Sequence, residues 1–244
     1  MSLIQSVLLA IVQGVAEFLP ISSSGHLNLA QHLLGTTPSL SFDIFLNTAT
    51  LLSVLFFFRS NINYFFKNLL FIIIASLPAA VVGVLFKNNI EAIFTDIKLL
   101  PLFFLITSLF IYLTRHTSSK DKKLNFKTAL VIGLFQAIAI LPGVSRSGST
   151  IFAALLMGLS PINAFQFSFC LFIPASIGAV LLDLKNLSNL SVFISPVYLT
   201  SFVVTFFVSL AALKYLRQLL IKNQIWYFSI YTFALALILL FIFK

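Results

Sequence analysis

Charged residues are scarce in this chain of 244 residues, because Lys, Arg, Asp and Glu together make up only 9%. An ordinary soluble domain carries about 25% charged residues. Hydrophobic residues make up 60%, and the 29 Phe residues lie in long apolar runs rather than alternating with polar residues. This composition excludes a soluble protein and favours membrane-spanning helices over an outer-membrane barrel. We therefore expect an integral membrane protein.

Cysteine is almost absent, since Cys170 is the single cysteine of the sequence. One cysteine excludes both a disulfide framework and a cysteine-based metal cluster. The N-terminus lacks a basic segment followed by a small-residue cleavage site, so we expect no removable signal peptide. The net charge of +9 does not indicate nucleic-acid binding, because the Lys and Arg residues cluster in short loops between apolar runs. That pattern fixes the orientation of a chain in a membrane.

Two polar stretches interrupt the apolar sequence. Residues 13–26 read Gln-Gly-Val-Ala-Glu-Phe-Leu-Pro-Ile-Ser-Ser-Ser-Gly-His, and residues 136–150 read Gln-Ala-Ile-Ala-Ile-Leu-Pro-Gly-Val-Ser-Arg-Ser-Gly-Ser-Thr. Glu17, His26 and Arg146 are costly in a bilayer unless they are buried in protein or face a water-filled cavity. We therefore expect the functional site at these two stretches.

A shift of 123 residues overlays the sequence on itself without a gap, which indicates an internal duplication. Repeat 1 covers about residues 1–122 and repeat 2 about residues 123–244, within a single integral membrane domain (1–244). The paired identities include Gln13 with Gln136, Ala16 with Ala139, Ser22 with Ser145, Ser24 with Ser147, Gly25 with Gly148, Gly35 with Gly158 and Pro38 with Pro161.

Each repeat begins with an apolar arm that runs into its polar stretch, and a short second arm follows. The first arms are residues 3–19 and 129–141, and the second arms are residues 27–34 and 151–159. The second arms are well short of the ~20 residues that a spanning helix needs. We predict two re-entrant helix-loop-helix hairpins, which are tolerated at membrane depth only when protein shields them or they face a cavity. The alternative is a single kinked spanning helix in each repeat.

Three runs long enough to span the membrane follow each hairpin. Since three crossings are an odd number, the second repeat must start on the opposite face from the first. The predicted fold is therefore an all-α polytopic membrane protein of two inverted-topology repeats, each with a re-entrant hairpin and three transmembrane helices. The runs are residues 41–58, 69–86 and 97–113, then 164–182, 197–213 and 225–243.

The basic residues test this topology independently. One face carries most of them, so it is cytoplasmic by the positive-inside rule, and both termini lie outside. The two hairpins then enter from opposite faces, and their tips can meet inside the bundle. The cytoplasmic set is Arg59, Lys67, Arg115, Lys120, Lys122, Lys123, Lys127, Lys214, Arg217 and Lys222; the other face has Lys87, Lys98, Lys185 and Lys244 beside Glu91, Asp96 and Asp183.

Hydroxyl groups gather where each second arm begins. They can cap free backbone N–H groups, or they can belong to a helix N-terminus that holds an anion such as phosphate. Arg146 favours the anion, because it is the only Lys or Arg that we assign to the membrane interior and its planar fork suits two phosphate oxygens.

The first stretch supplies an acid and a base. His26 lies one helical turn after Ser22 and Ser23, so we expect a Ser–His contact. Glu17 could orient His26, act as a base or hold a divalent cation. Gln13 lies one turn before Glu17 and offers only neutral polar contacts. Together these are the parts needed for phosphoryl transfer.

The pattern Glu/Gln-Gly-x-x-Glu-Phe-Leu-Pro-x-Ser-Ser-x-Gly-His, paired with Pro-Gly-x-Ser-Arg-Ser-Gly-x-Thr, resembles the signature of the bacterial undecaprenyl-diphosphatase family, the BacA-type bacitracin-resistance proteins. The resemblance covers nearly the whole chain. It implies hydrolysis of undecaprenyl diphosphate to undecaprenyl phosphate and inorganic phosphate, which recycles the lipid carrier for peptidoglycan and confers bacitracin resistance. It also implies a multi-pass protein of the bacterial cytoplasmic (inner) membrane, a site open to the outer face, and a divalent cation, Mg²⁺ or Ca²⁺.

Carried over by motif position, the resemblance assigns catalytic roles to Glu17, Ser23, His26 and Arg146, with Glu17 also the metal ligand. Ser23 and His26 are both candidates for the nucleophile. The expected substrate-binding residues are Gln13, Ser22, Ser24, Gly25, Ser145, Ser147, Gly148 and Thr150.

A departure from the family pattern at two positions, and the choice of Gln at a third, lower the expectation for other roles. The first spanning run has Asn47 and Ala49 where the family commonly has a His and then a Gly, which leaves any role for that helix in doubt. Gln13 stands where the family has Glu or Gln, which weakens a two-carboxylate metal site.

Our hypothesis is that Arg146 and hairpin N–H groups hold the diphosphate while Ser23, deprotonated by His26, attacks the terminal phosphorus. Attack by His26 itself stays open. The polyprenyl chain remains in the bilayer, and a homodimer is compatible with the sequence. The alternative is a polyprenyl-phosphate flippase or transporter, because inverted repeats with broken helices are a transporter architecture. The unlike pairing of Arg146 with Ser23 across the repeats favours one chemical site instead.

Overall fold

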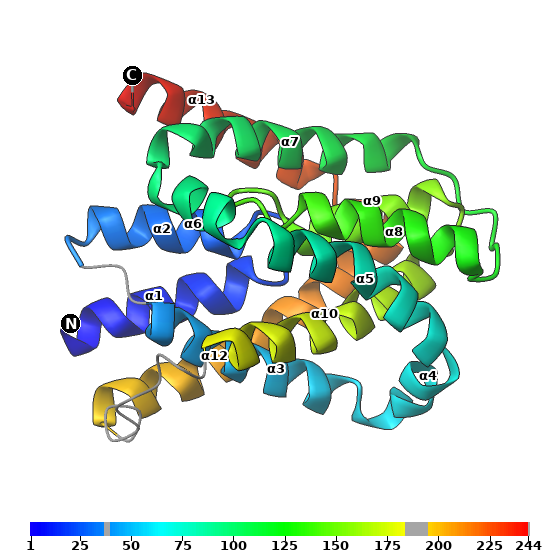
Figure 1. Ribbon diagram of the computed structural model, residues 1–244, viewed down its shortest axis with the longest axis horizontal. Helices are drawn as coiled ribbons and strands as arrows, with labels where there is room; N and C mark the ends of the chain where they lie inside the picture. Colours follow the sequence, from blue (N-terminus) through cyan, green and yellow to red (C-terminus); the bar gives the residue numbers. More distant parts are fainter. Residues whose placement is uncertain (37–39, 184–194, 244) are drawn as a thin grey trace.

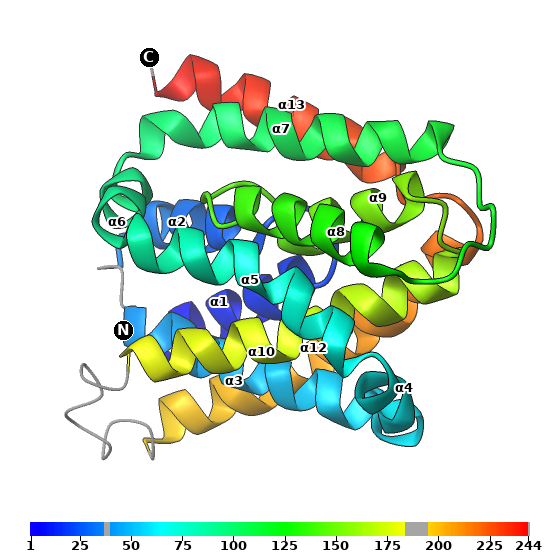
Figure 2. The ribbon, with the colours of Figure 1, turned by 45° about the vertical axis from the view of Figure 1, so that its right-hand side comes forward.

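The computed structural model describes residues 1–36, 40–183 and 195–243, and this part of the chain consists of helices joined by loops, without strands (Figures 1 and 2). Lys185 and Lys244 lie outside the described residues. The N-terminal half of the chain contains α1 (Leu3–Ala16), α2 (Ser23–Leu33), α3 (Leu40–Phe57), α4 (Ile62–Lys67), α5 (Leu69–Leu85), α6 (Lys87–Thr95) and α7 (Leu100–Leu113). The C-terminal half contains α8 (Phe126–Ile138), α9 (Arg146–Leu156), α10 (Pro161–Asp183), α12 (Pro196–Ile221) and α13 (Tyr227–Ile242).

Several helices are long and apolar enough to cross a bilayer. Within the described residues, three qualify alone: 97–116, 161–181 and 196–221. Two bent pairs qualify together, Ser41–Phe57 with Arg59–Lys67 at 58° and Leu69–Leu85 with Lys87–Phe94 at 80°. The chain is therefore a multi-pass helical membrane protein.

The predicted runs correspond to these helices with two differences. The runs at 41–58 and 69–86 continue into the short helices α4 and α6, because the polar tripeptides at 59–61 and 87–89 end each apolar run and the chain turns there. The last run forms a helix of 16 residues, shorter than a full span.

Each polar stretch forms two helices joined by a loop rather than one kinked helix. α1 and α2 make the first helix-loop-helix hairpin, and α8 and α9 make the second (Figure 1). The two second arms, α2 and α9, have the same length of 11 residues. Both begin with a serine cap, since the Oγ of Ser22 accepts from the N–H of Gly25 and that of Ser145 from the N–H of Gly148.

Long helices enclose the two hairpins. α1 packs on α12, α8 packs on α5, and α7 lies along α13 (Figures 1 and 2). A buried aromatic core lies where the loop of the first hairpin meets α10, because the rings of Phe18 and Phe169 are 5.4 Å apart and those of Phe18 and Phe172 are 5.9 Å apart. This core supports the loops that carry the polar residues.

Candidate active site

The tips of the two hairpins touch in the interior of the bundle. A Cβ atom added at Gly25 would lie 3.1 Å from the Cα of Gly143 and 2.7 Å from the ring of Phe104. A Cβ added at Gly148 would lie 3.2 Å from the Cβ of Pro20. Gly143 also has a φ of +93°, which favours glycine. The glycines of both motifs therefore permit the close approach that builds a shared site.

Glu17 connects the two tips. Its Oε1 accepts a hydrogen bond of 2.8 Å from Nη2 of Arg146, and its Oε2 accepts one of 2.5 Å from Oγ of Ser23. Gln13, one turn earlier on α1, donates from Nε2 to Oε2 at 3.2 Å. The side chains of Arg146 and Glu17 are only 15% and 13% exposed. Four predicted site residues thus form one cluster where the two hairpin tips meet.

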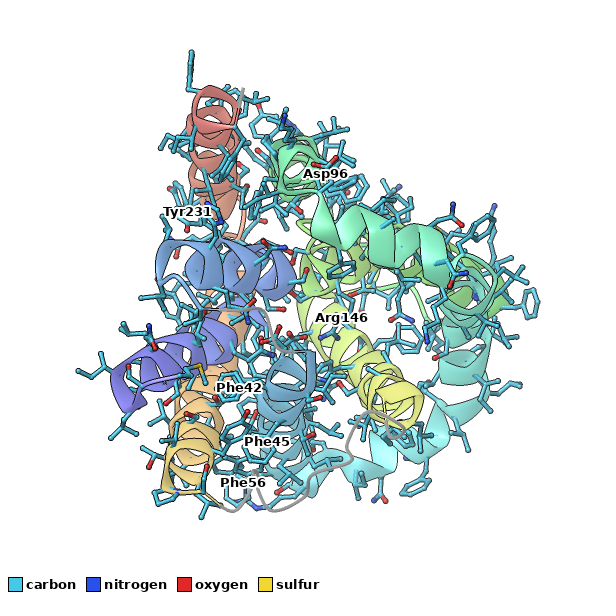
Figure 3. All side chains as sticks on the ribbon, turned by 60° about the vertical axis from the view of Figure 1, so that its left-hand side comes forward. Phe42, Phe45, Phe56, Asp96, Arg146 and Tyr231 are labelled. Carbon is cyan, nitrogen blue, oxygen red and sulfur yellow. The ribbon has the colours of Figure 1, made fainter. Side chains whose placement is uncertain are left out.

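Arg146 uses one of its two terminal nitrogens, Nη2, in the contact with Glu17, whereas the other, Nη1, has no partner among the described residues. It begins α9 and lies near the middle of the bundle in Figure 3. Its guanidinium carbon lies 4.2 Å from the centroid of the Phe172 ring, a cation–π contact that fixes the plane of the fork. Nη1 is buried and has no hydrogen-bond partner among the described residues. A buried unpaired donor is costly, so this atom is suited to an anionic oxygen.

His26 is oriented by groups other than the expected serine side chain. Its Nδ1 donates to the carbonyl oxygen of Ser22 at 2.8 Å, since a carbonyl can only accept. Its Nε2 then accepts from the hydroxyl of Tyr231 at 2.7 Å. The Tyr231 ring stacks on the imidazole with centroids 5.6 Å apart, and the Phe104 ring contacts it edge-on.

The expected partnership of Ser23 with His26 is therefore replaced by a hydrogen bond between Ser23 and Glu17. The backbone explains the difference, because Ser22 has a φ of +73° and this turn brings its carbonyl oxygen to the imidazole. Ser23, the first residue of α2, instead directs its hydroxyl to the end of α1. Likewise, Glu17 contacts Ser23 and Arg146 rather than orienting His26.

The remaining predicted hydroxyls mainly support the tips. Ser22 and Ser24 have their Oγ atoms 3.3 Å apart, and Ser145 and Ser147 have theirs 3.2 Å apart. Thr150 donates to the carbonyl oxygen of Arg146 at 2.9 Å and its hydroxyl lies 2.6 Å from that of Ser168 on α10. The structure thus uses Thr150 to join α9 to α10, outside the cluster around Glu17.

Asn47 and Ala49, the two positions that depart from the family pattern, lie on α3 and contribute to its packing. The Oδ1 of Asn47 accepts from Thr50 at 3.3 Å and from Ser176 on α10 at 3.5 Å. Ala49 is fully buried. Both residues therefore serve the packing of α3.

Three residues near the tips carried no clear signal in the sequence, because each lies in a long apolar run. Phe172 and Tyr231 contact Arg146 and His26 as described above. Thr107 on α7 is 1% exposed; its hydroxyl accepts from the N–H of Ser145 at 2.8 Å and donates to the carbonyl of Gly143 at 2.7 Å. Thr107 therefore holds the second tip in shape.

Replacing Thr107 by Val is expected to destabilise the protein by about 1–3 kcal/mol, because two buried backbone groups lose their partner. Thermal unfolding in detergent measures the change. Thr107→Ser keeps the hydroxyl and is expected to restore most of the stability. Equal melting temperatures for the Val variant and the wild type would contradict this role.

Protein ligands for a metal ion are few at the tips. The described residues contain no group of three or more His, Cys, Asp or Glu side chains that could hold an ion. Glu17 is the carboxylate of the cluster, and Arg146 already contacts one of its oxygens. This donor set does not form a site of three protein ligands. It fits a Mg²⁺ ion that one carboxylate and substrate phosphates hold together.

Comparisons with known proteins identify the family of this chain. Residues 6–238 match the family model described as "Bacitracin resistance protein BacA". Undecaprenyl-diphosphatase 1 of Bacillus cereus is 37% identical, over 96% of this chain and 95% of the relative. The undecaprenyl-diphosphatase of Thermosipho melanesiensis is 39% identical, over 95% and 96%. That of the archaeon Methanobrevibacter smithii is 36% identical, over 98% and 96%. The chain therefore belongs to the family of the bacitracin resistance protein BacA.

Proposed function

We propose that this protein hydrolyses undecaprenyl diphosphate to undecaprenyl phosphate and inorganic phosphate, and thereby recycles the lipid carrier and confers bacitracin resistance. The observation that carries the proposal is the hydrogen-bonded chain from Ser23 through Glu17 to Arg146. These contacts support the proposal, because a hydroxyl that can act as nucleophile, a carboxylate that can act as base and a cation that can bind phosphate lie together. The family and the names of the relatives support the same reaction.

Binding of the substrate begins with the attraction between its negatively charged diphosphate and Arg146. Nη1 of Arg146 has no partner within the described structure, so it donates a hydrogen bond to an oxygen of the diphosphate. The N-terminus of α9, where Arg146 is the first residue, adds a favourable dipole for the anion. Nη2 meanwhile keeps its contact with Oε1 of Glu17, which leaves Oε2 to the hydroxyl of Ser23.

Ser23 then attacks the terminal phosphorus. Its Oγ lies 2.5 Å from Oε2 of Glu17, so Glu17 takes the hydroxyl proton as the new P–O bond forms. The bond from that phosphorus to the bridging oxygen breaks, Glu17 passes the proton to this departing oxygen, and undecaprenyl phosphate leaves. Glu17 then takes a proton from a water molecule that attacks the phosphoserine, and it returns this proton to the Oγ of Ser23 as inorganic phosphate leaves. This assigns to Glu17 the role that the sequence suggested for His26.

Trapping the intermediate distinguishes Ser23 from His26 as the nucleophile. Because Nδ1 of His26 donates to a carbonyl and Nε2 accepts from Tyr231, neither ring nitrogen is free to attack. We expect that brief reaction with a substrate labelled in the terminal phosphate, followed by acid quench and peptide mapping, finds the label on Ser23. The His26→Ala variant is expected to retain this label. Label on His26 would overturn the assignment.

We further propose that a divalent cation, Mg²⁺ or Ca²⁺, enters with the diphosphate and is held by Glu17. The support is the single carboxylate of the cluster, which suits a cation that keeps phosphate and water ligands. Such an ion would offset the negative charge of the transferring phosphoryl group.

We also propose that the single membrane domain consists of two inverted repeats in the cytoplasmic membrane, with both hairpins re-entrant. The helix pairs support this, because α1 packs on α12 as its counterpart α8 packs on α5. The two termini lie at one end of the bundle, while α4 and the α12–α13 connection lie at the other (Figure 1). The basic residues of those connections favour a cytoplasmic location, so both termini and the opening of the site lie outside.

Phosphate release from undecaprenyl diphosphate by the purified protein in detergent tests the proposed reaction. We expect release that requires Mg²⁺ or Ca²⁺ and stops on chelation. Failure of the folded wild type to release phosphate would contradict the proposal and favour the polyprenyl-phosphate flippase. Both tips come from one chain, so this site needs no homodimer.

A further inference from the structure

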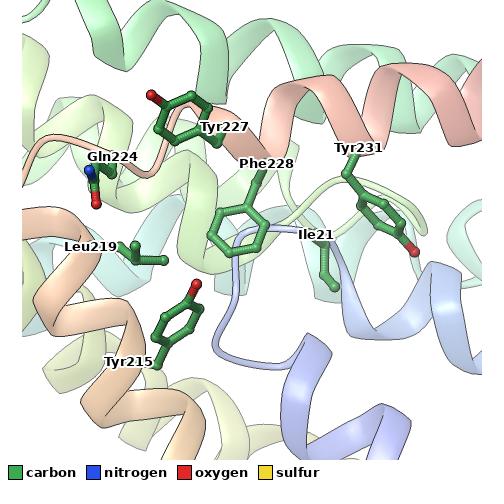
Figure 4. Close-up of a pocket in the computed structure, with 7 residues that line it drawn as sticks. All are labelled: Ile21, Tyr215, Leu219, Gln224, Tyr227, Phe228 and Tyr231. Carbon is green, nitrogen blue, oxygen red and sulfur yellow. The ribbon is translucent and has the colours of Figure 1, made fainter.

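A cavity lies between the end of α12 and the beginning of α13, next to the first hairpin. Its volume is ≈ 420 Å³, and Figure 4 shows its side chains converging from both helices and from the loop of the first hairpin. We call it the α12–α13 pocket. Its lining is mainly apolar and aromatic: Ile21, Tyr215, Leu219, Gln224, Tyr227, Phe228 and Tyr231.

The inner end of the pocket adjoins the proposed catalytic cluster. Ile21 lies in the loop immediately before Ser22 and Ser23 and is 7% exposed. Tyr231 lines the pocket and also donates its hydroxyl to Nε2 of His26 at 2.7 Å. One wall of the pocket is therefore also the support of the first tip.

The outer end of the pocket opens on the flank of the helix bundle. Tyr215 is 51% exposed and Tyr227 is 52% exposed. On the topology proposed above, this flank lies in the cytoplasmic half of the membrane, since the α12–α13 connection is at the cytoplasmic end of the bundle. The pocket thus leads sideways from the outer surface of α12 and α13 to the first tip.

We propose that the α12–α13 pocket binds the first isoprene units of the polyprenyl chain while the diphosphate lies at the tips. This inference rests on the proposed function. The substrate is one molecule whose hydrocarbon chain is bonded to the diphosphate, so the chain must leave the polar cluster through an adjoining apolar opening. The pocket is such an opening, and its volume is typical of small-molecule sites. Tyr231 presents its ring to the pocket and its hydroxyl to His26 at the first tip.

Filling the pocket tests this inference by substrate comparison. Leu219 projects into the pocket from α12 (Figure 4), and Leu219→Trp is expected to fill it. We expect kcat/KM for undecaprenyl diphosphate to fall by at least about tenfold, as other steric losses in apolar pockets do, while kcat/KM for ethyl diphosphate stays unchanged. The matched control Val203→Trp lies on the exposed face of the same helix, away from the pocket, and is expected to alter neither value. Equal losses for both substrates, or no loss for either, would overturn the inference.

A photolabelling experiment separates this inference from the proposed reaction. The probe is a polyprenyl diphosphate with a diazirine on its first isoprene unit, applied to the wild-type protein in detergent. We expect the label on α12 or α13 residues of the pocket, lost in Leu219→Trp and retained in Val203→Trp. Labelling of the pocket residues without any phosphate release would support binding of the chain in the pocket and contradict the proposed hydrolysis. Phosphate release with the label outside the pocket would contradict binding of the chain there. Displacement of the label by phospholipid without loss of activity would contradict it as well.

Discussion

Glu17→Gln is expected to reduce phosphate release by about 10³-fold, within the range that loss of a general base produces. The amide keeps the shape of the side chain but cannot take the proton of Ser23. It also removes the charge that pairs with Arg146 across the two tips. The rate constant for phosphate release at saturating undecaprenyl diphosphate measures the effect.

The stability of the Glu17→Gln variant has to be measured beside its activity. Removing one partner of a buried ion pair can cost about 3–5 kcal/mol, and both side chains here are mostly buried. Melting temperature in detergent separates loss of fold from loss of the base. Asp121→Asn, the same chemical change in the loop after α7, is the matched control. A folded Glu17→Gln protein with wild-type activity would exclude Glu17 as the base.

Arg146→Lys is expected to reduce phosphate release by about 10²–10³-fold, the loss seen when one preorganised donor to a developing anion is removed. Lys keeps the positive charge, so the pairing with Glu17 can persist. It lacks the planar fork that lets Nη2 hold Glu17 while Nη1 remains available, and it lies less well over Phe172. The same phosphate-release assay measures the loss.

Arg115→Lys provides the control for this prediction. Arg115 also contacts an aromatic ring, that of Trp226 at 4.9 Å, but it lies beyond the end of α7 and outside the tips. We expect this variant to keep the wild-type rate. If both Arg-to-Lys changes have the same small effect, the fork of Arg146 is not used in the reaction.

Much of the site could be predicted from the sequence because charged and hydroxyl groups are conspicuous in an apolar chain. Ser22 and Ser145 cap α2 and α9 as the capping rule expects. The duplication indicated that two separate stretches belong together, and the structure places Glu17 against Arg146. The residue types and their spacing were sufficient to predict that these residues belong to one site.

The partners of each group could not be predicted in the same way. Spacing along a helix suggested that Ser23 would meet His26, but the positive φ of Ser22 reorients the first turn. Tyr231 and Thr107 are separated from the tips by many residues, and each lies in a run that reads only as membrane helix. Contacts between distant helices depend on packing, which a local pattern does not record. The bends after α3 and α5 were not predicted, because an apolar run indicates the length of a helix but not a change in the direction of its axis.

A double-mutant cycle on phosphate release tests most directly the claim that the two tips form one hydrolytic site. Wild type, Glu17→Gln, Arg146→Lys and the double variant would be assayed together with undecaprenyl diphosphate and Mg²⁺. Residues that act as a unit show strongly non-additive losses. We therefore expect the wild type to release phosphate and the double variant to be no slower than the slower single variant by more than a few fold. Losses that multiply, or a folded wild type that releases no phosphate, would contradict the account.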